Sequence, residues 1–143
     1  MARILAIDDD LGVLFFLKAG LATGGHEVAV AETPRAGFRE ACWRGADAIL
    51  LDINMPGTNG LDLLKKFKGD ERTSHIPIVM YTGQDVEEFK EKAYLNYAEA
   101  FVLKSATLEE ILTRLEGAIA TAPSAPPKRF SPFMQVIANV CCS

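Results

Sequence analysis

The sequence has few cysteines, little tryptophan and no excess of basic residues. Its 143 residues include three cysteines, one tryptophan, and 15 lysines and arginines against 19 aspartates and glutamates. An odd number of cysteines at irregular spacing does not describe a disulfide framework, which argues against a disulfide-stapled secreted domain. The formal net charge of −4 gives no sign of the basic surface that nucleic-acid binders use, so direct contact with nucleic acid is not expected.

Long hydrophobic runs are also absent. The first apolar run, RILAI, is followed at once by three aspartates, Asp8–Asp10, and is too short for the hydrophobic region of a signal peptide. Nowhere does the chain approach the roughly 20 consecutive apolar residues that span a bilayer. We therefore expect a cytoplasmic protein without a membrane contact.

The chain does contain a regular alternation of short apolar runs and segments with helical periodicity. The runs expected to form strands are Arg3–Ile7, Glu27–Ala31, Ala48–Leu51, Ile76–Tyr81 and Ala100–Leu103. The segments expected to form helices are Leu11–Leu21, Pro34–Arg44, Leu61–Lys68, Asp85–Tyr97 and the stretch that starts at Leu108. Strands that are apolar on both faces are typical of a parallel sheet covered by helices on each side. The sequence predicts an α/β fold with a doubly wound, five-stranded parallel sheet and helices on both of its faces.

The composition changes after this alternation ends. Residues 1–122 are expected to form one domain, and residues 123–132 contain four prolines, which is typical of a linker. In residues 133–143, Phe133, Ile137 and Val140 recur at helical spacing, but so short a helix is not stable alone in water. This apolar tail could dock on its own domain, on a second copy in a homodimer, or on a partner.

Polar residues follow four of the five expected strands. They are Asp8–Asp10 after the first strand, Asp52 after the third, Thr82 after the fourth and Lys104 after the fifth. In open α/β sheets the binding crevice lies beyond the carboxyl ends of the strands. If these four strands are neighbours, the polar side chains converge there.

Such a set of residues suits phosphoryl chemistry with a divalent cation. Several carboxylates in one crevice repel each other, and Mg²⁺, which prefers oxygen ligands, removes that cost. Histidine and cysteine, the usual zinc ligands, are missing from the set. A lysine and the cation would neutralise phosphoryl oxygens while an ionised aspartate attacks phosphorus and forms an acyl phosphate.

Four motifs, ILAIDDD, LLDINMPGTNG, VMYTG and FVLK, occur in this order between about Arg3 and Ala122. With these motifs the sequence resembles the receiver domains of two-component response regulators and is similar to the single-domain chemotaxis regulators. The resemblance implies a flavodoxin-like fold and a phosphorylation-activated signalling switch. It also implies that Asp52 accepts a phosphoryl group from a sensor histidine kinase or a phosphotransfer protein.

The resemblance assigns further roles to individual residues. Asp8, Asp9, Asp52 and the backbone carbonyl of Asn54 would hold Mg²⁺. Lys104 would pair with the phosphoryl group. The resemblance implies no enzymatic activity beyond self-phosphorylation and autodephosphorylation.

The switch residues implied by the resemblance are Thr82 and Phe101. Thr82 would move toward the phosphoryl group, and Phe101 occupies the place of the family's switch aromatic. The output would be contact with a downstream protein, through the surface formed by the fourth helix, the fifth strand and the fifth helix. Gly83 would leave space beside the acceptor, while Asn54 and Gln84 would tune phosphoryl hydrolysis.

The sequence departs from the family pattern at two positions. Ser105 follows Lys104, where the family usually has a proline joined by a cis peptide bond. A cis bond without proline costs roughly 3 kcal/mol, so we expect a trans Lys104–Ser105 bond. Tyr97 stands where a glycine normally ends the fourth helix, so the chain could continue as helix or turn unusually before the fifth strand.

Two other functions fit parts of the sequence. A degenerate receiver would serve as a phosphorylation-independent binding module, and the missing proline favours it. A haloacid-dehalogenase-type enzyme would use Asp8 as nucleophile and Asp10 as acid, but the chain is short for that fold and lacks its late acidic pair.

Overall fold

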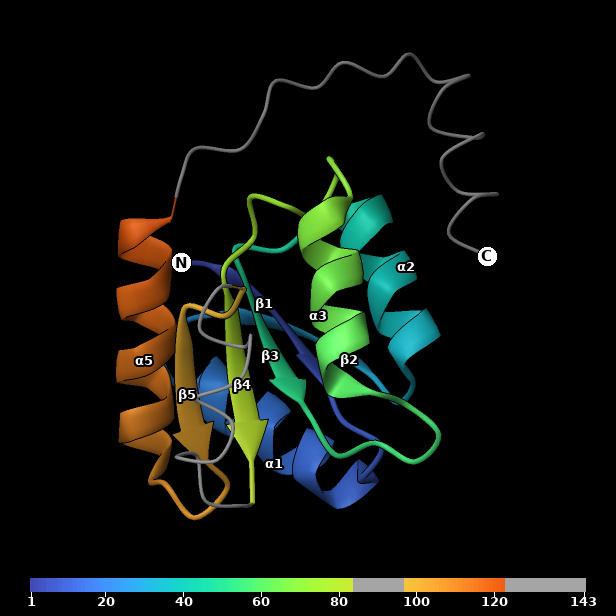
Figure 1. Ribbon diagram of the computed structural model, residues 1–143. Coiled ribbons are helices and arrows are strands. Elements are labelled where there is room, and N and C mark those ends of the chain that lie inside the picture. The colour runs from blue at the N-terminus through green and yellow to red at the C-terminus, as the bar shows by residue number, and fades with distance from the viewer. Residues whose placement is uncertain (84–96, 123–143) are drawn as a thin grey trace.

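The computed structural model of the chain describes residues 1–83 and 97–122 (Figure 1). Strands and helices alternate along the described residues, as the sequence predicts. The strands are β1 (Arg3–Ile7), β2 (Glu27–Ala31), β3 (Ala48–Asp52), β4 (Ile78–Thr82) and β5 (Ala100–Leu103). The helices are α1 (Leu11–Ala22), α2 (Pro34–Arg44), α3 (Gly60–Gly69) and α5 (Leu108–Thr121). Most of the expected fourth helix, Gln84 and the expected linker and tail lie outside the described residues.

The strands form one parallel sheet in the order β2-β1-β3-β4-β5. The chain therefore moves outward from β1 to one edge, returns, and continues to the other edge. Figure 1 shows α2 and α3 on one face of the sheet and α1 and α5 on the other. This is the doubly wound, flavodoxin-like arrangement that the sequence predicts, with its change of direction between β1 and β3.

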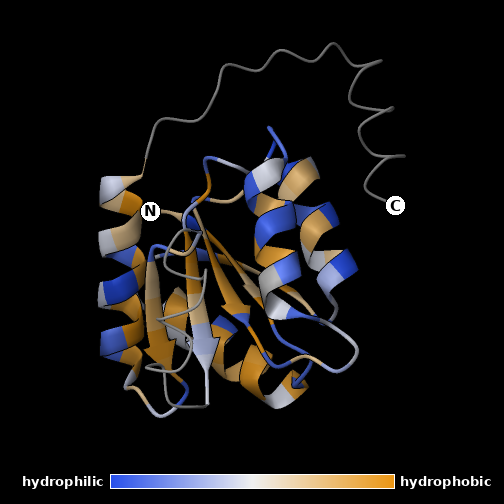
Figure 2. Ribbon diagram, viewed as in Figure 1, coloured by the Kyte–Doolittle hydropathy of each residue, from blue (hydrophilic) through white to orange (hydrophobic). Residues whose placement is uncertain are grey.

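Alternation along the strands divides the apolar side chains between two cores. Leu5 and Ile7 of β1 belong to the core beneath α2 and α3, whereas Ile4 and Ala6 belong to the core beneath α1 and α5. Successive side chains of a strand point to opposite faces, so a strand covered on both sides must be apolar throughout. The strands are largely orange in Figure 2 for this reason. The apolar strands end at the margin of these two cores. The polar residues at the carboxyl ends of the strands therefore lie together at one edge of the sheet.

The helix starts are defined by side-chain caps. Asp10 caps α1 by accepting from the backbone N–H groups of Gly12 and Val13. Thr33 and Thr107 cap α2 and α5 in the same way. In each case a side-chain oxygen satisfies amide donors that have no partner inside the helix, which fixes the residue at which the helix begins.

The expected fourth strand, Ile76–Tyr81, is wrong at both ends, since β4 runs from Ile78 to Thr82. The N–H of Ile76 bonds to the carbonyl of Thr73 in a turn, at 3.0 Å. Pro77 has no N–H to give to a neighbouring strand. The two apolar residues therefore extend the core without joining the strand.

Tyr97 does not extend the expected fourth helix up to β5. It lies in a turn, is partly buried, and packs against the core beneath α2 and α3. Among the described residues only glycines have a positive φ, so Tyr97 does not adopt the left-handed conformation of a glycine at a helix end. Packing accounts for this tyrosine.

The core predicts a sharp contrast between two neighbouring positions of α3. Leu64 is fully buried and Lys65 is exposed. We expect Leu64→Ala to lower the free energy of unfolding by about 2–5 kcal/mol, because it leaves a cavity. Lys65→Ala should change it by no more than about 0.5 kcal/mol. Urea unfolding of both variants measures the difference, and equal losses would contradict the assigned packing.

Candidate functional site

The site lies at the carboxyl ends of β1, β3, β4 and β5. Because these strands are neighbours in the sheet, their ends bring Asp8, Asp52, Thr82 and Lys104 to one edge. Asp8 is only 1% exposed and Asp52 only 2%, while Thr82 is fully buried. The convergence expected from the sequence is confirmed. It places two carboxyl groups where water cannot solvate them freely.

Carboxylates of three residues form a cluster. Each of Asp8, Asp9 and Asp52 offers an oxygen, and these atoms all lie within 4.8 Å of one another. Asp9 is exposed, so the cluster is open to solvent on one side. Each buried carboxylate is fixed by a backbone bond: Asp8 Oδ1 accepts from the N–H of Asp10 at 2.9 Å, and Asp52 Oδ1 accepts from that of Asn54 at 3.0 Å.

Lys104 lies between the two buried carboxylates. Its Nζ is 3.0 Å from Asp8 Oδ2 and 3.4 Å from Asp52 Oδ2. The lysine side chain is 30% exposed and its Nζ lies 5.7 Å from the centre of the Tyr81 ring. The N–H of Lys104 also bonds to the carbonyl of Thr82 at 2.7 Å, which ties the end of β5 to β4.

The Lys104–Ser105 peptide bond is trans, since the described residues contain no cis peptide bond. The expectation for this departure from the family pattern is thus confirmed. The trans bond does not direct the lysine away from the site. Its ammonium group contacts both acidic residues.

Burial and charge set the protonation of the site. Burial raises the pKa of Asp8, and the nearby charge of Asp52 raises it further, although the Asp10 N–H and Lys104 act in the opposite direction. Burial tends to lower the pKa of Lys104, but its contacts with Asp8 and Asp52 outweigh that effect and raise the pKa. The lysine is therefore charged at neutral pH. The raised pKa of Asp8 means that its ionisation is less favourable than that of an ordinary aspartate.

The donor set fits a magnesium ion. Asp8 Oδ2 is buried, and among the described residues it accepts no hydrogen bond of good geometry; its contact with Lys104 is an ion pair. The atom therefore keeps a lone pair for a cation. Mg²⁺ takes oxygen ligands and retains several waters, which suits carboxylates at an open edge. The cluster of Asp8, Asp9 and Asp52 can hold such a metal.

The two expected switch residues lie on neighbouring strands. Met80 pairs with Phe101, and Thr82 pairs with Leu103, so Thr82 and Phe101 project from the same face of the sheet. Phe101 is partly buried against the core beneath α2 and α3. A methyl group at Gly83 would lie 4.0 Å from Lys104 Cδ, so the position is close to the lysine without a clash.

Asn54 lies just beyond Asp52 and is exposed. Its N–H orients the Asp52 carboxylate, as described above, which the sequence alone did not predict. The expected role of its backbone carbonyl as a metal ligand stays a prediction.

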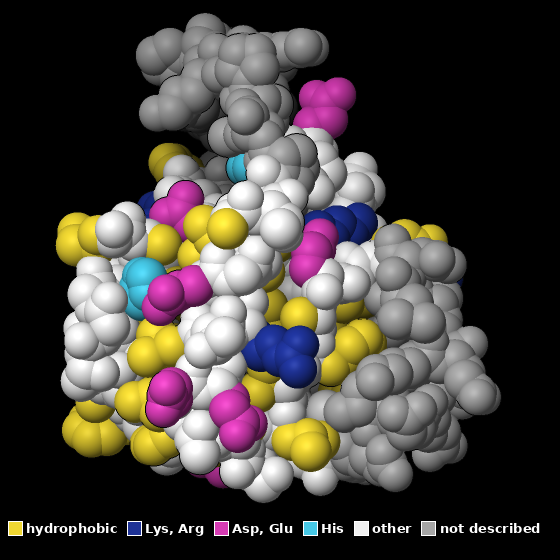
Figure 3. Space-filling view, turned by 90° about the vertical axis from the view of Figure 1, so that its left-hand side faces the viewer, with side chains coloured by type: hydrophobic (Ala, Val, Ile, Leu, Met, Phe, Trp, Pro, Cys, Tyr) yellow, Lys and Arg dark blue, Asp and Glu magenta, His cyan; other side chains and the backbone are white. Residues whose placement is uncertain are grey.

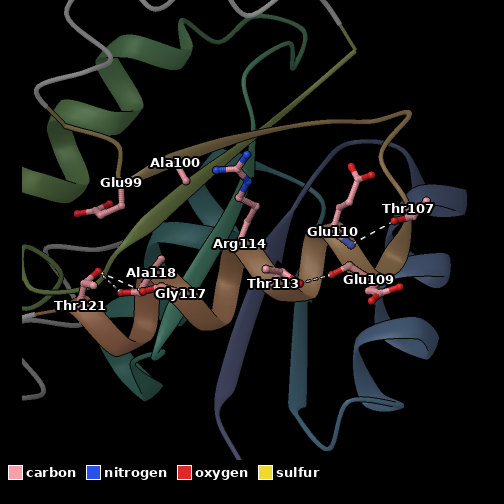
Figure 4. Close-up of a pocket in the computed structure, with 10 residues that line it drawn as sticks. All are labelled: Glu99, Ala100, Thr107, Glu109, Glu110, Thr113, Arg114, Gly117, Ala118 and Thr121. Atoms are coloured by element: carbon pink, nitrogen blue, oxygen red, sulfur yellow. Dashed lines mark hydrogen bonds between the residues drawn. The ribbon is translucent and has the colours of Figure 1, made fainter.

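A groove runs along the exposed side of α5, next to β5 (Figure 4). Its volume is about 830 Å³, and Arg114 extends from the helix toward the strand. The described residues that line it are Glu99, Ala100, Thr107, Glu109, Glu110, Thr113, Arg114, Gly117, Ala118 and Thr121. The sequence pointed to this surface only as a region. Among its charged residues, Glu99, Glu109 and Arg114 were not predicted, because they carry no motif.

Comparison with known proteins settles the family. The family model of the response regulator receiver domain matches residues 4–116. The chain belongs to this family. This receiver domain is thus part of the two-component signalling systems, whose receivers are signalling switches and generally not enzymes. The family favours a receiver over the dehalogenase-type enzyme.

Relatives of this receiver domain differ in length. PilH of Pseudomonas aeruginosa is 33% identical over 120 residues, which cover 84% of this chain and 99% of PilH. The phosphate regulon transcriptional regulatory protein PhoB of the same organism is 31% identical over 116 residues, 81% of this chain and 51% of PhoB. The chain likewise spans about half the length of several other regulators that it matches.

Solved structures agree with the fold. Chemotaxis protein CheY4 of Vibrio cholerae superimposes with a TM-score of 0.76 and 27% identity, covering 82% of this chain and 98% of CheY4. NtrX of Brucella abortus gives a TM-score of 0.76 and 26% identity, covering 84% of this chain and 27% of NtrX. No helix among the described residues of this receiver domain is long and apolar enough to cross a membrane.

The raised pKa of Asp8 predicts a stabilising substitution. A carboxyl whose pKa is higher in the folded than in the unfolded chain costs stability as the pH rises above its ordinary value of 3.8. We therefore expect Asp8→Asn to raise the Tm of the metal-free protein at pH 7 by a few degrees, on the order of 1 kcal/mol. The gain should vanish near pH 3, where wild-type Asp8 is protonated in both states.

Thermal unfolding in EDTA at both pH values measures this effect. Asp62→Asn is the matched control, because Asp62 is exposed in the first turn of α3 and should give no gain. A lower Tm for Asp8→Asn at pH 7 would show that the ion pair with Lys104 outweighs the cost of burial.

Proposed function

We propose that the chain is a phosphorylation-activated switch whose Asp52 accepts a phosphoryl group in a magnesium-dependent reaction. The observation that supports this most directly is the position of Asp52: it is buried at the end of β3, within reach of Asp8, Asp9 and Lys104. The donor is a sensor histidine kinase or a phosphotransfer protein. The proposal includes the expected domain division at residue 122 and a cytoplasmic location.

The backbone leaves one oxygen of Asp52 free to react. Oδ1 accepts from the N–H of Asn54, while Oδ2 faces Lys104. We assign the attack to Oδ2: it forms the bond to phosphorus as the bond from phosphorus to the donor histidine nitrogen breaks, and the electron pair leaves with the imidazole. The product is an acyl phosphate on Asp52.

Lys104 and Thr82 act on the transferred group. The ammonium group of Lys104 is held between the two buried carboxylates, from which it can pair with a phosphoryl oxygen. Thr82 ends the adjacent strand and offers a hydroxyl donor. Both contacts stabilise negative charge that spreads over the phosphoryl oxygens.

Asp8, Asp9 and Asp52, together with the backbone carbonyl of Asn54, are the residues that would hold Mg²⁺. The ion supplies positive charge that offsets the carboxylates and the phosphoryl oxygens. Asp8 carries the strongest argument for this assignment, because its buried Oδ2 pairs with Lys104 but has no hydrogen-bond partner among the described residues.

The output is contact with a downstream protein. Thr82 and Phe101 project from one face of the sheet on neighbouring strands, so a movement of Thr82 toward a phosphoryl group changes the space beside Phe101. The groove between β5 and α5 begins at Ala100, the neighbour of Phe101 in the chain. This route links the acceptor to a surface that a partner protein can read.

The passive binding module draws little support from the site. The passive module was considered because Ser105 stands in place of the usual proline. Lys104 nevertheless reaches both carboxylates with a trans peptide bond before Ser105. A module without phosphoryl chemistry would have no need to bury two carboxylates around one lysine.

The first test is phosphorylation by a small donor. With Mg²⁺ and acetyl phosphate, we expect the wild-type chain to gain the mass of one phosphoryl group and Asp52→Asn to gain none. Excess EDTA should abolish the gain. Asp62→Asn, which changes an exposed carboxylate, should behave as wild type. Intact mass spectrometry measures all four cases, and an inert wild type in the presence of Mg²⁺ would favour the passive module.

The second test separates acceptance of the phosphoryl group from the structural change that follows it. Thr82→Ala removes the buried hydroxyl but leaves the carboxylates and Lys104 in place, so it should still be phosphorylated. We expect it to lose the change in hydrogen exchange that phosphorylation causes in β5 and α5. Thr82→Ser keeps the hydroxyl and should retain at least half of that change. An unaltered response in Thr82→Ala would remove Thr82 from the switch.

A further inference from the structure

Helix α1 exposes an apolar face that the site and the sheet do not use. Its inward residues, Leu14, Leu17 and Leu21, are buried. On the outside, Leu11 is 61% exposed, Phe15 79% and Phe16 50%. We call this the outer face of α1; it comprises Leu11, Phe15, Phe16, Ala19 and Ala22, all of which are exposed.

This outer face is unusual for a helix on the surface of a sheet. Such helices normally place charged and polar residues outward, whereas Lys18 is the one charged residue of α1. Figure 3 shows hydrophobic side chains gathered at the lower left edge of the surface that includes α5. An exposed group of large apolar side chains of this kind marks a contact surface.

The segment 133–143 has the complementary character. It lies outside the described residues, but its sequence, FMQVIANVCCS, contains no charged residue. Phe133, Ile137 and Val140 recur at helical spacing, with Gln135 and Asn139 between them. A segment this apolar and short needs a surface on which to bury its side chains.

The linker between α5 and the segment 133–143 is long enough for that segment to reach α1. Helix α5 ends at Thr121 and lies against α1, where the space above Gly20 is filled by Leu108. The 14 residues of α5 span about 21 Å. The proline-rich residues 123–132 span up to about 31 Å when extended, so the tail can return along α5 and reach α1.

We propose that residues 133–143 dock on the outer face of α1 of the same chain. The tail brings apolar side chains without charges to a helix in which Lys18 is the one charged residue. A tether of this length holds the segment at millimolar effective concentration, which favours the same chain over a second copy. The contact would cover Phe15 and Phe16.

Disulfide trapping in the full chain tests this proposal, using the tail's own Cys141 and Cys142. In a Cys42→Ala background, Ala19→Cys places a thiol on the outer face of α1. Arg39→Cys places the control thiol on the exposed side of α2, on the opposite face of the sheet. Under mild oxidation we expect Ala19→Cys to form a disulfide to the tail within one chain at least tenfold faster than Arg39→Cys.

A second variant distinguishes docking of the tail on α1 from chance encounters that the tether alone allows. Phe133→Gln/Ile137→Gln keeps the tether and the thiols but removes the apolar contact, so it should slow trapping at position 19 to the rate of the control. Peptide mapping and gel filtration assign each disulfide to one chain or two. Trapping that ignores the tail substitutions would overturn the proposal, and so would disulfides that form only between two chains.

Discussion

The site depends on one electrostatic arrangement: two buried carboxylates share a single lysine. Asp8 and Asp52 lie at the ends of adjacent strands, and Lys104 from β5 reaches both. One positive charge faces two carboxylates there, and burial, with a smaller contribution from the charge of Asp52, raises the pKa of Asp8. In the proposed function, this imbalance favours the binding of a cation at the edge and then of a phosphoryl group.

The sheet can carry these buried charges because the two apolar cores, and not the site, stabilise it. The central strands β3 and β4 are buried along their whole length, and each contributes side chains to both cores. Parallel strands end at the same edge, so the two cores can be continuous while unfavourable groups collect beyond them. The backbone donors of Asp10 and Asn54 hold the carboxylates without adding charge. The energetic cost of the site is thus confined to residues at, or one position beyond, the ends of the strands.

Much of this could be predicted from the sequence, because the decisive features are local. Asp8 and Asp52 directly follow apolar runs, and parallel topology then places them together. The start of β4 could not be predicted, since an apolar pattern does not show that Ile76 gives its N–H to Thr73 in a turn. The reach of Lys104 past Ser105 depends on tertiary geometry, and the roles predicted for the site residues stay predictions. The charged lining of the groove beside α5 has no pattern in the sequence.

Helix α1 connects the acidic cluster with the surface of the molecule. Asp10 takes part in both: its N–H bonds to Asp8 Oδ1, and its own carboxylate caps the first turn of α1. The helix is also packed against α5 through the close approach of Gly20 to Leu108. A displacement of α1 along its axis would therefore strain the bond that orients Asp8, or lose the cap. The outer face of α1 therefore belongs to a helix that Asp10 joins to the cluster through these two hydrogen bonds.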